Sequence, residues 1–106
     1  KVFVDMINIK RVIEEVWDFY GPGGIYPNHF NNALTKAQVE DSVILVIDYF
    51  NNHDIEFEEG SYERGVILDV MIQRYEYDGL PPSTIEYVLG LDPYAEFIND
   101  IVKWAY

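Results

Sequence analysis

Apolar side chains recur at the spacing of an α-helix in four stretches of the chain, and clusters of turn-forming residues separate these stretches. In the first stretch they fall three or four positions apart and form one stripe along a helix. The stripe consists of Ile9, Val12, Ile13, Val16, Trp17 and Tyr20. Asn8 or Asp5 can cap this helix, and Gly21 with Pro22 ends it. The pattern predicts packed helices.

The second stretch opens with Thr35 and Gln38 at the spacing of a capping box. Its stripe consists of Val39, Val43, Val46, Ile47 and Phe50. Ile44 and Leu45 project from roughly the opposite side, beside two aspartates. A helix that is apolar nearly all round is usually central in its domain. We therefore expect this helix to be central, with the aspartates keeping part of its second side in water.

Two further helices follow from the same kind of evidence. Ser61 is expected to cap a helix over residues 62–77, and Asp92 to cap the last helix. The expected core residues are Ile67, Leu68, Met71 and Tyr75 in the former, and Tyr94, Phe97, Ile98, Ile101 and Trp104 in the latter. A short helix over residues 83–90 lies between them.

Residues 54–59 alternate between apolar and acidic side chains, which is the period of a short half-buried strand or extended loop. The sequence thus predicts a mainly α fold, a compact bundle of about four to five helices. One short two-stranded β element is a candidate addition, with residues 2–4 (Val2 to Val4) pairing residues 55–57 (Ile55 to Phe57). A length of 106 residues fits one globular domain, residues 1–106.

The strongest functional signal is an excess of acidic residues, 19 against 7 basic ones, which gives a net charge of −12. Eight of the acids lie between residues 54 and 78, where only Arg64 and Arg74 oppose them. Such a charge repels nucleic acid and anionic membrane surfaces, and it attracts basic proteins. We therefore expect a basic protein partner, and no direct binding of nucleic acid or membrane.

No group of residues matches a catalytic or metal centre. His29 and His53 lie in turn-like segments among asparagines, and no serine has the Gly-x-Ser-x-Gly pattern. A metal-dependent enzyme would use His53 with carboxylates of residues 54–58. An EF-hand loop counted from residue 54 needs glycine at position six and glutamate at position twelve, but Glu59 and Gly65 stand there. We expect a protein without enzymatic activity, cofactor or metal.

The chain has no cysteine, and its longest apolar run, residues 43–47, is far shorter than the roughly 18 residues needed to cross a bilayer. A small secreted domain is more often held together by disulfides, so the lack of cysteine favours the cytoplasm. In size, acidity and lack of cysteine the chain resembles the DNA-mimic and anti-defence proteins of bacteriophages, and the acidic immunity proteins that neutralise nuclease toxins. This resemblance is one of composition and assigns no role to any residue. For a phage-encoded protein it implies the host cell cytoplasm.

Our first hypothesis is a non-enzymatic inhibitor that binds the nucleic-acid-binding surface of a basic protein, such as a nuclease, a CRISPR or restriction component, a toxin or a nucleoid protein. In an extended segment, alternate carboxylates stand at steps of roughly 6.6 Å, comparable to the separation of neighbouring phosphates. The expected partner-binding residues are Asp54, Glu56, Glu58, Glu59, Tyr62, Glu63, Asp69, Glu76 and Asp78.

Our second hypothesis is a protein-interaction or assembly module that docks through an apolar face around Ile44 and Leu45. A homodimer formed through that face is one version of this hypothesis.

Overall fold

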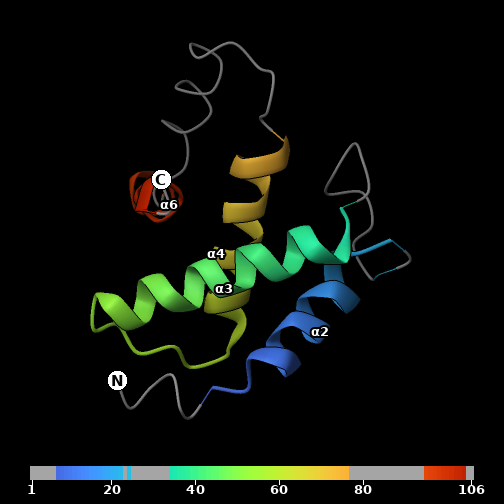
Figure 1. The fold of residues 1–106 in the computed structure, drawn as a ribbon, viewed down its shortest axis with the longest axis horizontal. Coiled ribbons are helices and arrows are strands. Elements are labelled where there is room, and N and C mark those ends of the chain that lie inside the picture. The colour runs from blue at the N-terminus through green and yellow to red at the C-terminus, as the bar shows by residue number, and fades with distance from the viewer. Residues whose placement is uncertain (1–6, 23, 25–33, 77–94, 105–106) are drawn as a thin grey trace.

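The computed structural model describes residues 7–22, 24, 34–76 and 95–104, which form a bundle of helices (Figure 1). The described α-helices are α2 (Ile9–Tyr20), α3 (Lys36–Asn52), α4 (Ser61–Met71) and α6 (Ala95–Trp104). A π-helical turn, η2 (Ile72–Glu76), prolongs α4. The expected mainly α bundle is confirmed. No helix within the described ranges is both long and apolar enough to cross a membrane.

Helix α3 is central, because α2, α4 and α6 all pack on it. Helices α2 and α6 lie on different sides of α3 and make no contact with each other. The predicted stripe of α3 is fully buried, and Leu45 is buried as well. Because its neighbours cover more than one side of α3, only a narrow outer strip that includes Ile44 is left to solvent.

The starts of two helices follow the predicted capping chemistry. The Oδ1 atom of Asn8 accepts a hydrogen bond from the backbone N–H of Arg11 at 3.1 Å. At the start of α3 the Gln38 backbone N–H donates to the Thr35 hydroxyl at 3.2 Å, and the Thr35 N–H donates to the Gln38 side chain at 2.8 Å. These bonds satisfy backbone donors that have no partner within the helix.

The start of α4 differs from the prediction. Gly60 occupies the cap position, and Ser61 is the first helical residue. Glycine has no side chain to accept a bond, so the capping contact runs from the Gly60 N–H to the side chain of Glu63. Ile67 and Met71 are buried as predicted, whereas Leu68 and Tyr75 are only partly buried.

The strand expected at residues 55–57 is not formed; this part of the chain is irregular. Asp54 and Glu59 adopt φ angles of 56° and 57°, in the left-handed region, and turn the chain at both ends of the segment. The proposed partner, residues 2–4, lies outside the described residues. The predicted alternation nevertheless appears in burial, because Phe57 is buried while Glu56 and Glu58 are exposed.

The last helix buries Ile98 and Ile101 as predicted, with Phe97 partly buried. Trp104 was expected in the core but is 42% exposed, because it is the last residue of α6. Its ring lies edge-on to Tyr49 at a centroid distance of 6.0 Å, at the carboxyl end of α3. The expected helix at 83–90, the cap at Asp92 and the core residue Tyr94 fall outside the described residues.

Candidate functional site

Residues 54–59, here called the acidic segment, connect α3 to α4 and carry three exposed carboxylates, those of Asp54, Glu56 and Glu58. The segment is fixed on its inner side. The backbone N–H of Ile55 donates to the Phe50 carbonyl at 2.9 Å. The buried ring of Phe57 packs edge-on against that of Phe50 at a centroid distance of 5.5 Å. The exposed carboxylates therefore stand on an ordered backbone.

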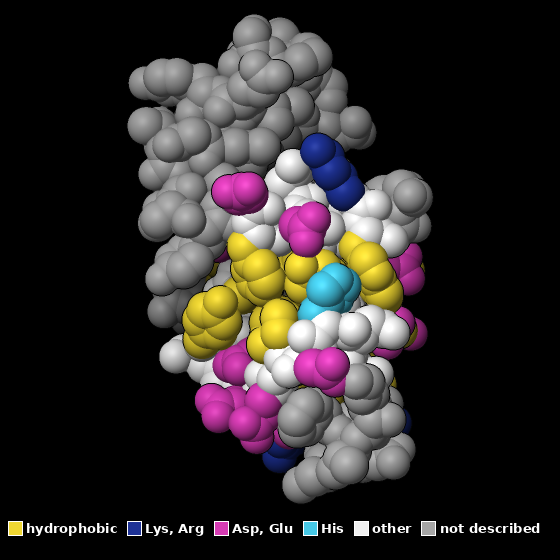
Figure 2. All heavy atoms as spheres, turned by 90° about the vertical axis from the view of Figure 1, so that its left-hand side faces the viewer, with side chains coloured by type: hydrophobic (Ala, Val, Ile, Leu, Met, Phe, Trp, Pro, Cys, Tyr) yellow, Lys and Arg dark blue, Asp and Glu magenta, His cyan; other side chains and the backbone are white. Residues whose placement is uncertain are grey.

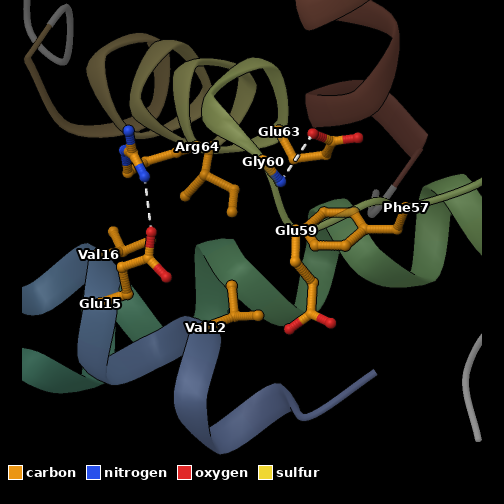
Figure 3. Close-up of a pocket in the computed structure, with 9 residues that line it drawn as sticks. Val12, Glu15, Val16, Phe57, Glu59, Gly60, Glu63 and Arg64 are labelled. Atoms are coloured by element: carbon orange, nitrogen blue, oxygen red, sulfur yellow. Dashed lines mark hydrogen bonds and ion pairs between the residues drawn. The ribbon is translucent and has the colours of Figure 1, made fainter. Parts of the chain in front are cut away.

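Glu63 fixes the end of the acidic segment from inside the protein. One oxygen of its carboxylate accepts the backbone N–H of Glu58 at 3.0 Å. The other accepts the backbone N–H of Gly60 at 3.1 Å, as Figure 3 shows. Glu63 is only 5% exposed. The sequence placed it among the partner-binding residues, but both its oxygens are engaged in holding the segment.

Glu59 is also engaged within the protein. Its Oε1 atom lies 2.7 Å from Nη2 of Arg11, a residue of α2 that is 48 positions away in the chain. The hydrogen bond that Arg11 donates to Glu59, together with the charge of Glu59, raises the pKa of Arg11 above its ordinary value. From the sequence, only Arg64 and Arg74 were expected to oppose the acids of this region. An ion pair between distant segments, such as that of Arg11 with Glu59, cannot be predicted from sequence spacing. Glu59 thus offers less negative charge to a partner than Glu56 or Glu58.

A narrow cleft lies beneath the acidic segment, between α2 and α4 (Figure 3). Its apolar walls are formed by Val12, Val16, Phe57 and Ile67, and Arg64 crosses it to Glu15 at 2.6 Å. Its volume is about 10 Å³, which is room for about one water molecule. The cleft is a packing junction and is too small for a ligand.

Four of the six lysines and arginines among the described residues lie on or beside α2. Lys10 and Arg11 belong to α2, while Lys36 and Arg64 pair with Glu14 and Glu15 of the same helix. Two bases of the described ranges lie elsewhere. Arg74 in η2 donates to the buried hydroxyl of Ser42, and Lys103 is exposed on α6. In this part of the chain no salt bridge reaches Glu56 or Glu58.

Figure 2 shows the face where α3 ends and α6 lies, which is the left-hand side of Figure 1. Carboxylates far outnumber lysine and arginine on this face, and they surround a group of hydrophobic side chains with a histidine among them. Negative charge thus predominates on this face of the molecule.

The other predicted partner-binding residues are spread along α4 and η2. Tyr62 is 52% exposed at the start of α4, three residues after the end of the acidic segment. Asp69 and Glu76 are half-buried further along, and Asp78 lies outside the described residues. Asp54, Glu56 and Glu58 thus share the acidic segment, with Tyr62 three residues beyond its end, whereas the other predicted acids lie elsewhere or are engaged within the protein.

Sequence reasoning missed an aromatic group at the carboxyl end of α3. The ring of His53 stacks on Tyr49 at a centroid distance of 3.9 Å, and its Nδ1 atom lies 2.9 Å from the Tyr49 carbonyl oxygen. The Tyr49 hydroxyl donates to Asp100 at 2.7 Å. Burial, followed by the bond to and charge of Asp100, raises the pKa of Tyr49 to about 12. The four-residue spacing of Tyr49 and His53 was the available signal.

The described residues offer no arrangement typical of catalysis. No group of three or more histidine, aspartate or glutamate side chains suited to a metal ion occurs among them. His53 is held in the aromatic stack and has no serine or carboxylate among its described contacts. What this surface can do chemically is attract and hold cationic groups.

No protein-family model, curated protein or solved structure matches the chain.

Proposed function

We propose that this protein is a non-enzymatic acidic inhibitor that occupies the nucleic-acid-binding surface of a basic protein. The observation that carries the proposal is the acidic segment. Glu56 and Glu58 are exposed and have no described base as a partner, while Phe57 and Glu63 hold their backbone in place. A surface built to bind phosphates presents arginine and lysine side chains, which bind carboxylates through the same charge-assisted hydrogen bonds.

Two physical features suit the acidic segment to this role. A preorganised array loses less conformational entropy on binding than a flexible acidic tail of the same charge. Lys36 and Arg64 pair with Glu14 and Glu15, whereas no described salt bridge reaches Glu56 or Glu58, so the field of the latter two is less neutralised. Complementary charge of this kind speeds association and selects basic partners. The partner classes that fit are nucleases, restriction and CRISPR components, toxins and nucleoid proteins.

The test compares two double variants with the same change in net charge. Glu56→Lys with Glu58→Lys reverses the acidic segment, whereas Glu40→Lys with Glu96→Lys reverses two exposed carboxylates on α3 and α6. Each is titrated against one purified representative of each partner class, with displacement of labelled duplex DNA as the readout.

We expect the protein to displace DNA from at least one representative. Reversal of the segment should weaken that binding by about tenfold or more at low salt, and the control by less than about threefold. The difference should shrink as salt screens the charges. Equal losses from both variants would mean that only net charge matters. A failure to displace DNA from any of the proteins would contradict the proposal.

The alternative proposal, docking through Ile44 and Leu45, has less support. Leu45 is 8% exposed and belongs to the core, so the expected face reduces to Ile44, which is 37% exposed beside Asp41 and Asp48. Ile44→Asp should leave the fold intact because the side chain is already in contact with water. A loss of self-association in this variant, measured by analytical ultracentrifugation, would restore the alternative.

A further inference from the structure

A groove lies where α4 packs against α6, and it begins directly after the acidic segment. Its volume is about 220 Å³, more than twenty times that of the cleft beneath the segment. The described residues that line it are Ser61, Tyr62, Gly65, Val66, Asp69 and Ile98. Pockets for whole small molecules are commonly about 300–1,000 Å³, so this groove is of a size for one side chain.

Gly65 keeps the middle of the groove open. It lies within α4, where glycine is less favourable than alanine by roughly 1 kcal/mol. A Cβ atom built on Gly65 would meet no other atom within 4 Å, so packing inside the domain does not require glycine there. A side chain at this position would occupy the groove, and its absence allows another chain to approach the helix backbone closely.

The lining places different chemistry at the two ends of the groove. Gly65, Val66 and Ile98 form an apolar floor. Tyr62 lies on one side of this floor and is 52% exposed. Asp69 follows Tyr62 by two helical turns, about 10.5 Å along the axis, and brings a carboxylate. No lysine or arginine of the described residues lines the groove.

We infer that this groove receives an arginine side chain of the basic partner; the inference rests on the proposed function and names its anchoring contact. An arginine has a methylene stem that can lie on the apolar floor. Its planar guanidinium binds a carboxylate through two parallel hydrogen bonds, which matches Asp69. The backbone of the partner then lies beside Tyr62, a residue type enriched at the energetic centres of interfaces. Neighbouring basic residues of the partner face Glu56 and Glu58.

The direct test is an NMR titration with N-acetyl-arginine-N-methylamide as the probe, followed at the backbone amides of Gly65 and Ile98. We expect saturable shifts at both amides with a Kd in the millimolar range, about the affinity of one small fragment. The matching norleucine compound, which has no charge, should give no saturable shift, and the lysine compound should bind several-fold more weakly. Equal binding of norleucine or lysine, or shifts confined to the acidic segment, would overturn the inference.

A graded series at Gly65 tests whether the groove itself is the site. Gly65→Ala should raise the midpoint of thermal unfolding, because helix propensity improves and the Cβ atom has space. Its affinity for the probe should lie between those of the wild type and Gly65→Leu, which fills the groove and should lose about tenfold or more. Asp69→Asn keeps the shape of the side chain but removes its charge, and it should also weaken binding of the probe. If Gly65→Leu fails to fold, the other two variants still decide the question.

The same variants separate this inference from the proposed function when they are titrated against the partner protein that is displaced from DNA. If Gly65→Leu weakens binding of the partner by about tenfold and the control variant on α3 and α6 does not, both the groove inference and the proposed function are supported. If Gly65→Leu binds the partner like the wild type while reversal of Glu56 and Glu58 abolishes binding, the groove inference is wrong and the proposed function survives. If neither change weakens binding, both are wrong.

Discussion

Glu63 illustrates, at the scale of a single residue, that an acid in this chain can serve the fold and leave the surface. In the sequence it is one of eight acids between residues 54 and 78, and the charge pattern does not distinguish it from the other seven. In the structure its two oxygens accept the N–H groups of Glu58 and Gly60. Glutamate three residues after a cap is a known helix-start signal, so spacing could have identified it once Gly60 was recognised as the cap.

Replacing Glu63 with alanine should therefore cost more stability than replacing an exposed acid. The backbone N–H groups of Glu58 and Gly60 would lose their charged acceptor, which should lower the free energy of unfolding by about 2–3 kcal/mol. Glu63→Gln keeps one acceptor oxygen and should lose about half as much. Glu40→Ala removes the same charge from an exposed position and should change the free energy of unfolding by less than about 0.5 kcal/mol. Urea unfolding followed by circular dichroism measures all three, and equal effects of Glu63→Ala and Glu40→Ala would contradict this role.

Tyr49 predicts a dependence of stability on alkaline pH. The folded protein holds the pKa of Tyr49 at about 12, above its ordinary value of 10.0. Folding therefore favours the protonated phenol, and the resulting stability is fully present below pH 10 and is lost as the pH rises toward about 12. Unfolding measured across this window should show a steeper loss in the wild type than in Tyr49→Phe. Identical slopes would mean that the bond to Asp100 does not hold the phenol.

The acidic segment is the element that the sequence described only in part. The alternation of side chains correctly indicated which residues turn inward. A strand also needs a hydrogen-bonding partner along its backbone. Here the left-handed residues Asp54 and Glu59 instead turn the chain at both ends of the segment. Local signals worked better for the helices, since the caps at Asn8 and Thr35 and the apolar stripes depend on neighbours in sequence. The exposure of Trp104 and the pairing of Arg11 with Glu59 depend on how distant helices pack, which no local pattern contains.

Hydrogen exchange should reveal how firmly this segment is held. The amides of Ile55, Glu58 and Gly60 donate to Phe50 and Glu63, so they should exchange more slowly than typical surface-loop amides. In Glu63→Ala the protection of Glu58 and Gly60 should fall, while that of Ile55 should persist because its acceptor is the Phe50 carbonyl. Exchange of all three amides at the rate of an open loop in the wild type would show that the segment is not preorganised.

At the scale of the whole molecule, a net charge of −12 makes repulsion among carboxylates a general cost of folding. Added salt screens this repulsion. Salt also weakens the three described salt bridges, but these lie at partly exposed positions, where such pairs contribute little to stability. We expect the midpoint of thermal unfolding to rise between about 0.01 and 0.5 M sodium chloride, and partner binding to weaken over the same range. Potassium chloride should act equally if screening is the cause. A midpoint that falls with salt would mean that the salt bridges outweigh the repulsion.

Three of the bases on and around α2 are matched by the acids that they pair with there, Glu14, Glu15 and Glu59, whereas no described salt bridge reaches Glu56 or Glu58. Negative charge is therefore spread unevenly over the described part of the molecule, which gives it a permanent electric dipole. A basic surface exerts a torque on such a dipole before any atoms touch, and the torque turns α2 away from that surface. The orientation of the first encounter is then selected during the approach, within the range that salt allows. A protein with the same net charge spread evenly would be drawn in with equal force but would arrive facing every direction.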